Sequence, residues 1–157
     1  MHIHFVCTGN VYRSRLAETY VKSLQVPGIE VSSSGVSAED NTNGPISWYA
    51  MRLIFNQKLH RYVKSMWQQT TKEHLDSADL IIFMTAYHLE YVQKHLGYTG
   101  ENYKVWYIDD IVRVQHEEKE DILLHEMEII KITEETFATL IHKAQSLLSE
   151  IKSYNRY

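Results

Sequence analysis

The sequence predicts an α/β protein with a parallel sheet wrapped by helices, and three observations support this prediction. Short apolar segments alternate with helical patterns along most of the chain, which is the order of βαβ units. Residues 80–84 (LIIFM) form one continuous apolar run, as expected of a strand buried on both faces. The chain has 157 residues, which suits one core, so we expect a single domain over residues 1–157.

The first quarter of the chain reads as strand, helix and strand. Residues 3–7 (IHFVC) form the first expected strand. Ser14 is placed to cap a helix that begins near Arg15. The Pro-Gly pair at 27–28 breaks that helix, and residues 29–34 form the second expected strand.

The next part of the chain has weaker signals. Residues 35–44 read as a polar loop, and Pro45 suits the first turn of a helix that runs to about Phe55. Residues 56–69 are polar with scattered aromatic side chains and give no clear pattern. A short helix is expected over residues 71–77.

The second half begins with the buried strand 80–84. A helix over residues 86–96 follows and ends at Gly97. Residues 104–108 form the fourth expected strand, and the acid-rich segment 109–131 is predicted to be largely a solvated loop. The last helix carries an apolar stripe that we assign to the core, formed by Phe137, Leu140, Ile141, Ala144, Leu147, Leu148 and Ile151.

Composition and charge narrow the functional classes. The formal net charge of −4 argues against bulk binding of nucleic acid, which needs a basic surface. No signal peptide or membrane-spanning apolar run is evident, so a cytoplasmic protein without membrane contact is expected. A single cysteine excludes an internal disulfide and a four-cysteine zinc site. Neither a metal nor another cofactor is expected.

The sharpest local signal is the segment 6–14 (VCTGNVYRS), which follows the first strand. A lone cysteine at the end of an apolar strand is usually an inert core residue. Here, however, Gly9 permits unusual backbone conformations, and the helix start adds partial positive charge. Such a loop can point N–H groups at a phosphate-sized anion while Arg13 binds two of its oxygens. The same fields favour the thiolate form of Cys7.

A cysteine six positions before an arginine in an anion cradle points to one reaction class. The thiolate attacks phosphorus in line and a cysteinyl-phosphate forms. Arg13 and the loop N–H groups hold the equatorial oxygens, and Ser14 can donate a hydrogen bond to the thiolate. A carboxylic acid protonates the leaving group and then acts as the base on water. We therefore interpret Cys7 as a nucleophile.

The segment VCTGNVYRS with LAE after it resembles the phosphate-binding loop of the low-molecular-weight protein tyrosine phosphatases. Residues 32–36 (SSSGV), 43–44 (NG) and 77–85 (SADLIIFMT) extend the resemblance. Met-Thr at 84–85 resembles the bacterial branch that includes protein-arginine phosphatases. The resemblance implies a three-layer fold with a four-stranded parallel sheet, helices on both faces and a phosphate-binding loop after the first strand.

Site residues also follow from the resemblance. It implies Cys7 as nucleophile and Arg13 as phosphate clamp, with Asn10 and Ser14 shaping the loop. It extends the phosphate-binding loop to four further residues, Thr8, Gly9, Val11 and Tyr12. The implied partners are a phosphorylated protein substrate and a phosphate or other oxyanion in the loop.

The general acid is less clear. The family uses an aspartate followed by proline, and this chain has no Asp-Pro pair. An ungapped alignment from Val105 to the last helix gives Asp121 as the candidate acid. The alternatives are Asp109, Asp110 and Glu128.

Other departures bear on the substrate and on redox behaviour. Tyr12 stands where many members have a second cysteine, so an internal protective disulfide is impossible. Ser65 replaces a common histidine, and Arg15 stands where proline or glutamine is common. Arginine-specific relatives typically have threonine at the position of Val11, and an aliphatic residue is typical of tyrosine-specific members.

Phosphotyrosine is therefore the favoured substrate, and phosphoarginine is the alternative. A third interpretation is a phosphate- or phosphoprotein-binding module with weak activity, motivated by the missing Asp-Pro pair. Trp48 and Tyr49 are the aromatic residues closest to where an aromatic wall would be expected.

Overall fold

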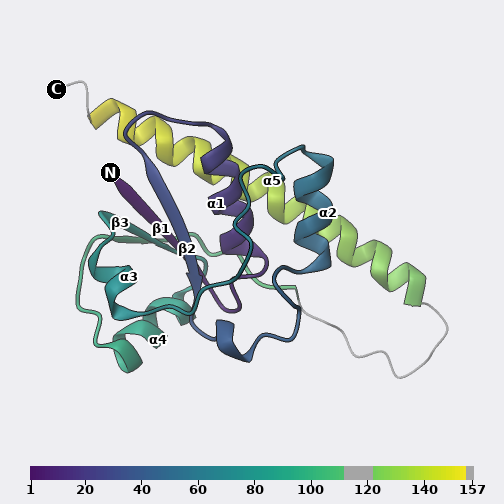
Figure 1. The fold of residues 1–157 in the computed structure, drawn as a ribbon, viewed down its shortest axis with the longest axis horizontal. Helices are drawn as coiled ribbons and strands as arrows, with labels where there is room; N and C mark the ends of the chain where they lie inside the picture. Colours follow the sequence, from purple (N-terminus) through teal and green to yellow (C-terminus); the bar gives the residue numbers. More distant parts are fainter. Residues whose placement is uncertain (112–121, 155–157) are drawn as a thin grey trace.

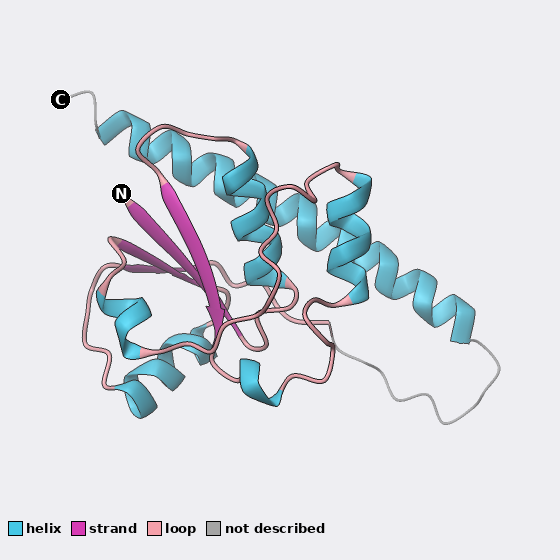
Figure 2. Ribbon diagram, in the orientation of Figure 1, coloured by secondary structure: helices cyan, strands magenta, loops and turns pink. Residues whose placement is uncertain are grey.

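The computed structural model describes residues 1–111 and 122–154. Its centre is a four-stranded parallel sheet in the order β2-β1-β3-β4 (Figure 2). The strands are β1 (His2–Cys7), β2 (Glu30–Gly35), β3 (Leu80–Phe83) and β4 (Tyr103–Val105). In the register of the sheet, Cys7 is opposite Gly35 and Val6 is opposite Phe83. The carboxyl ends of β1, β2 and β3 therefore meet at one edge.

Helices cover both faces of this sheet (Figure 1). They are α1 (Arg13–Ser23), α2 (Trp48–Asn56), α3 (Lys72–Asp76), α4 (Ala86–Leu96) and α5 (Ile122–Tyr154), with a short 3₁₀ helix over Ala38–Asp40. One core lies between the sheet and α1, α2 and α5, and includes Phe5, Leu16 and Leu140. The other lies beneath α3 and α4 and includes Phe83 and Val92. The predicted α/β architecture, with a loop after the first strand, is confirmed.

Two helix starts differ from the prediction. α1 begins at Arg13 with Tyr12 at its N-cap, so Ser14 lies inside the first turn and does not cap the helix. Its hydroxyl contacts Cys7 instead. α2 is capped by Ser47, whose side chain accepts a hydrogen bond from the Ala50 N–H. Pro45 therefore lies before the helix and not in its first turn.

The acid-rich segment is partly helical, contrary to the prediction of a solvated loop. Residues 122–131 belong to α5, and residues 112–121 lie outside the described part of the chain. This end of α5 reaches α2, where Arg52 forms an ion pair with Glu134 at 3.0 Å. Ile129 is buried there, whereas Glu128 and the apolar side chains of Leu123 and Met127 are exposed. No helix within the described residues has the length and apolarity needed to cross a membrane.

Candidate active site

The Cys7 thiol sits at the carboxyl end of β1, where the chain turns through residues 8–12 into α1. Its Sγ lies 3.0 Å from the Ser14 Oγ and accepts a hydrogen bond from the Asn10 N–H at 3.3 Å. Asn10 Nδ2 donates to the Ser14 Oγ at 2.8 Å, which leaves the Ser14 hydroxyl hydrogen available to the sulfur. The Cys7 sulfur therefore has two hydrogen-bond partners within the loop and the first turn of α1.

Asn10 determines the shape of the loop. Its backbone φ is 53°, in the left-handed region that asparagine tolerates better than most residues. Its side chain is fully buried; Nδ2 also donates to Ser33 Oγ at 2.8 Å, and Oδ1 accepts from the Gln68 N–H at 2.8 Å. These bonds fix the strained conformation that directs the Asn10 N–H toward Cys7.

Gly35 lets the end of β2 approach the loop. A Cβ atom at this position would lie 2.4 Å from the Thr8 carbonyl oxygen and 2.6 Å from the Asn10 nitrogen. These neighbours are backbone atoms, so they cannot move aside cheaply. The backbones remain joined beyond this point, because the Val36 N–H donates to the Cys7 carbonyl at 3.0 Å. The loop geometry therefore depends on a glycine at the end of β2.

The Arg13 guanidinium is buried and lies at the same site. Its NH2 group donates to the Asp110 Oδ2 at 2.7 Å and to the Thr8 Oγ1 at 3.3 Å. Its NH1 group donates to the Ile108 carbonyl at 2.8 Å. The segment after β4 thus holds the arginine against the loop, and Asp110 is its direct charge partner.

His88 supports the loop from α4. Its Nδ1 accepts from the Thr85 N–H at 3.0 Å, so Nε2 carries the ring proton and donates to the Thr8 Oγ1 at 3.0 Å. Burial, followed by the positive charge of Arg13, lowers the pKa of His88 to about 3. The imidazole is therefore neutral at physiological pH and acts as a fixed hydrogen-bond donor.

A cavity of about 440 Å³ opens over the loop. Its lining includes Cys7, Thr8, Gly9 and Arg13, while Asp40 and Asp110 supply carboxylates. Its apolar lining is formed by Val11, Tyr12, Tyr49 and Ile111. Tyr12 also packs into the core, and burial raises its pKa to about 12, so its phenol stays neutral. The cavity therefore combines the loop that follows Cys7 with an apolar wall and two acids.

The acid candidates lie in different places. Asp110 lines the cavity, while Asp109 is its exposed neighbour. Glu128 is exposed on α5 and does not line the cavity. Asp121, the acid predicted from the ungapped alignment, lies outside the described residues.

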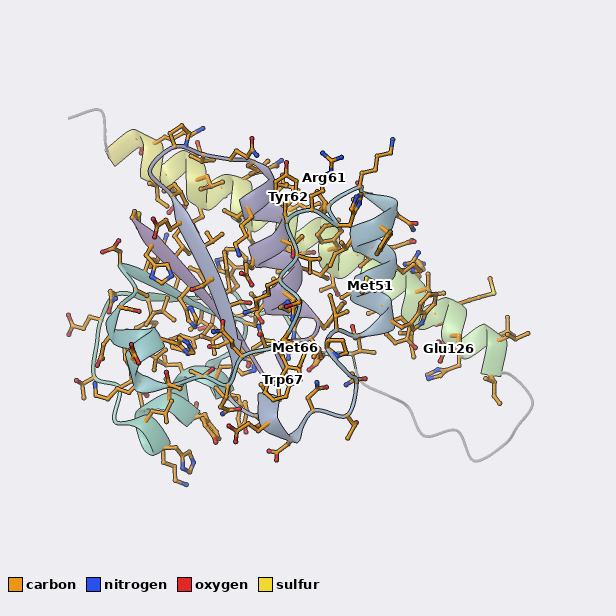
Figure 3. All side chains as sticks on the ribbon, viewed as in Figure 1. Met51, Arg61, Tyr62, Met66, Trp67 and Glu126 are labelled. Atoms are coloured by element: carbon orange, nitrogen blue, oxygen red, sulfur yellow. The ribbon has the colours of Figure 1, made fainter. Side chains whose placement is uncertain are left out.

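α2 contributes Tyr49 to the cavity, whereas its neighbour Trp48 is exposed. The Tyr49 hydroxyl donates to the Glu126 Oε2 at 2.6 Å, which ties this wall to α5; Figure 3 shows Glu126 on α5. Within the described residues, no group of three or more histidine, cysteine or acidic side chains is arranged to hold a metal ion.

Three residues of the site were not predicted from the sequence, namely His88, Gly35 and Asp40. Thr85 and His88 have the i, i+3 spacing of a capping box, but histidine in place of glutamate gave no signal. The role of Gly35 was accessible in principle, because it ends the strand expected beside the first one. Asp40 lies on a 3₁₀ turn in an irregular loop, where spacing carries no information.

A parallel sheet with Cys7 at the start of the loop after its first strand is the arrangement expected of the class of phosphatase that the loop motif resembles. A family profile described as low molecular weight phosphotyrosine protein phosphatase matches residues 2–156. The chain belongs to this family and is a phosphatase-like hydrolase. The resemblance inferred from the loop motif is confirmed.

Relatives and solved structures agree on the family and differ in substrate. The chain is 29% identical over 153 residues to a protein-arginine-phosphatase of Bacillus subtilis, covering 96% of this chain and 98% of that protein. It is 36% identical over 97 residues to the low molecular weight protein-tyrosine-phosphatase PtpB of Staphylococcus aureus, covering 62% and 66%.

Two solved structures match nearly the whole fold. A mutant of YwlE from B. subtilis matches with a TM-score of 0.66 and 27% identity, over 94% of this chain and 98% of that one. Wzb of Vibrio vulnificus, solved with benzylphosphonate, matches with a TM-score of 0.73 and 19% identity, over 95% and 97%. The second match supports the fold alone.

Proposed function

We propose that the protein hydrolyses phosphotyrosine in protein substrates through a cysteinyl-phosphate intermediate. One observation carries the proposal: Cys7 and Arg13 line the same cavity, at the end of β1. In this proposal Cys7 is the nucleophile and Arg13 binds the phosphate oxygens. Asn10 and Ser14 hold the sulfur in place by hydrogen bonds, and the remaining loop residues, Thr8, Gly9, Val11 and Tyr12, surround the phosphate.

The reaction then proceeds in two steps. In the first, the Cys7 sulfur attacks phosphorus, the bond between phosphorus and the tyrosine oxygen breaks, and a carboxylic acid gives that oxygen its proton. In the second, the resulting carboxylate takes a proton from water, whose oxygen attacks phosphorus. The S–P bond breaks, inorganic phosphate leaves, and the thiolate and the protonated carboxylic acid are restored.

Asp110 is the acid we favour among the candidates. Its carboxylate borders the cavity that holds Cys7 and lies 2.7 Å from Arg13, at the mouth of the phosphate site. Its Oδ1 accepts the Ile111 N–H at 2.9 Å, which orients the carboxylate without the proline of the family motif. Asp121 remains the candidate from the ungapped alignment, and mutation of each aspartate to asparagine distinguishes the two.

The choice of phosphotyrosine rests on the wall of the cavity. Val11, Tyr49 and Ile111 present apolar and aromatic surface beside the anion loop. A flat phenyl ring that leaves water gains free energy on such a surface. An aliphatic residue at position 11 also offers no hydroxyl to a nitrogen-linked phosphate.

Phosphoarginine is a second candidate, supported by a specific feature. Asp40 and Asp110 both line the cavity, and two carboxylates are suitable acceptors for the N–H groups of a guanidinium. The match over nearly the whole chain to a protein-arginine-phosphatase supports the same reading.

A direct comparison tests the choice. The same peptide backbone is prepared with phosphotyrosine or with phosphoarginine, and kcat/KM is measured for wild type and for Cys7→Ser. We expect turnover by wild type only, with phosphotyrosine preferred. A preference of more than about tenfold for phosphoarginine, about 1.4 kcal/mol, would overturn the substrate assignment. Equal rates for wild type and Cys7→Ser would instead favour a phosphoprotein-binding module.

A further inference from the structure

Arg15 is a buried arginine that the proposed chemistry does not use. It lies on α1 two residues after Arg13, its exposed fraction is 1%, and it does not line the cavity. Its NH1 group donates to the Asn10 carbonyl at 3.3 Å and to the Pro45 carbonyl at 3.1 Å. Its NH2 group donates to the Lys64 carbonyl. One guanidinium thus joins three separate segments of the chain.

These three segments surround the site. Asn10 belongs to the anion loop, and Pro45 belongs to the segment that leads into α2. Lys64 belongs to residues 57–71, which connect α2 to α3 and pass beside α1 (Figure 1). Figure 3 labels Met66 and Trp67 on the same segment. Bonds to these carbonyls therefore connect the loop with the two irregular segments that flank it.

The buried charge of Arg15 has only partial compensation. Burial lowers its pKa, and the negative charge of Glu18 on the same helix opposes that shift. Glu18 is itself buried and is shared with Lys22 at 2.6 Å and Lys64 at 3.5 Å. Burying a cation among neutral carbonyls costs stability unless its hydrogen bonds are well formed. Arg15 meets that requirement through its two terminal nitrogens, while its Nε is buried without a hydrogen-bond partner among the described residues.

The conformation of Asn10 links Arg15 to the reacting sulfur. Arg15 holds the Asn10 carbonyl, while the Asn10 N–H faces Cys7 and the Asn10 side chain accepts from the Gln68 N–H. Segment 57–71 is therefore connected to the loop in two ways. Gln68 donates directly to the Asn10 side chain, and the Lys64 carbonyl is joined to the Asn10 carbonyl through Arg15. Since Asn10 has a left-handed φ, its conformation needs such external support.

We propose that Arg15 is a positioning residue, a clamp that fixes the Asn10 carbonyl to the segments before and after α2 and thereby holds the anion loop ready for phosphate. This inference rests on the proposed function, because it takes the loop to be a phosphate site. The proposed role depends on the ability of the planar guanidinium fork to donate to several carbonyls at once, and not on its positive charge alone. Arg13, Lys64, Lys22, Glu18 and Asp110 supply the other charges around the loop.

The test measures binding of inorganic phosphate by titration calorimetry, at a temperature where every variant is folded. Arg15→Met removes the fork, and we expect its Kd for phosphate to rise about tenfold. Arg15→Lys keeps the charge and most of the volume, and folds if Arg15→Met does not. Because an ammonium cannot bridge three carbonyls in the same geometry, we expect its Kd to rise nearly as much.

A matched control separates positioning from general loss of stability. Val92→Ala removes a buried side chain from the core beneath α4, on the other face of the sheet. It should lower Tm and leave the phosphate Kd within about twofold of wild type, because Val92 does not line the cavity. The clamp is overturned if Arg15→Met or Arg15→Lys binds phosphate as wild type does, or if Val92→Ala weakens binding equally.

The binding assay also separates this inference from the proposed function. A wild-type protein that binds phosphate but turns over no phosphoester would refute the proposed function, and the clamp would still be decided by the variants. A wild-type protein that hydrolyses phosphotyrosine, together with an Arg15→Lys variant of unchanged phosphate Kd, would refute the clamp alone. No phosphate binding by wild type would refute both.

Discussion

At the level of single residues, Arg13 has two partners in the proposed reaction, the Asp110 carboxylate and the phosphate of the substrate. Arg13 is 2.7 Å from the Asp110 carboxylate in this structure, and it is also the group that would bind phosphate. A bound phosphate dianion competes for the same N–H donors, so substrate binding should free the carboxylate to face the leaving group. The ion pair is half exposed, so its main effect is orientation and not stability.

This role of Asp110 predicts a dependence on the leaving group. Asp110→Asn should lower kcat about 100-fold for phenyl phosphate, whose phenolate leaving group needs a proton. The loss should be smaller for p-nitrophenyl phosphate, whose leaving group is far less basic. Steady-state kinetics with both substrates measure the difference.

Asp121→Asn is the matched control for that measurement. It makes the same chemical change at the acid inferred from the ungapped alignment, and it should leave the rates with both substrates unchanged. If Asp121→Asn shows the leaving-group dependence and Asp110→Asn does not, the acid is Asp121.

At the level of elements, the end of β2 controls the loop after β1. The two parallel strands run in register to Cys7 and Gly35, so any atom added at Gly35 meets the loop backbone. The end of β2 therefore restricts the backbone of the loop over residues 8–12, and α1 follows directly after that loop. Loop and strand form one geometric unit.

Gly35→Ala should therefore inactivate a protein that still folds. The added Cβ pushes against Thr8 and Asn10, and a displacement of this kind near the reacting atoms costs about 100-fold in kcat/KM. Gly28→Ala is the control, since a Cβ there meets nothing within 4 Å and strains only a positive φ of 75°. It should cost about 1 kcal/mol of stability and no activity. Equal activity losses in the two variants would contradict this account.

The sequence predicted regular elements better than irregular ones. Three strands and the helix over residues 86–96 were expected close to where they lie, because apolar runs and glycine stops are local signals. The fourth strand was expected over residues 104–108 but ends at Val105. The first turn of α5 carries no acid and was missed because the loop expected from the acid run was extended over all of residues 109–131. Ser14 was misread as a cap because a serine before an apolar stripe looks the same when it faces a thiol.

The site residues were likewise predictable only where the signal is local in sequence. Cys7 and Arg13 were found because the loop motif is local in sequence. Asp110 was only one of several alternatives, because without an Asp-Pro pair its contact with Arg13, 97 residues away, has no sequence signature. The same holds for Arg15, whose three acceptors are carbonyls that any residue type supplies.

For the whole molecule, two buried histidines predict how stability depends on pH. Burial lowers the pKa values of His4 and His88 to about 3, while the value for an unfolded chain is 6.5. Their folded forms stay neutral as the unfolded chain takes up protons. The free energy of unfolding is therefore highest, as far as these two histidines are concerned, above pH 6.5. It decreases as pH falls from 6.5 toward 3.

Between pH 7 and pH 5 the free energy of unfolding should fall by about 2 kcal/mol for each of these histidines. Urea unfolding at the two pH values measures the change. His4→Gln, which keeps a polar side chain between Ser32 and Ser34, should remove about half of the difference between the two pH values. His60→Gln, at an exposed position, should keep the full difference. Equal wild-type stability at both pH values would refute the prediction.

The central claim is that Cys7 carries the phosphoryl group. Wild type and Cys7→Ser are mixed with a phosphotyrosine peptide, quenched in acid within the first turnover, digested, and analysed by mass spectrometry. We predict one added phosphoryl group on the wild-type peptide that contains Cys7, appearing and decaying at rates that account for kcat. Turnover by wild type with no phosphoryl group on that peptide, or with the group on another residue, would contradict the account.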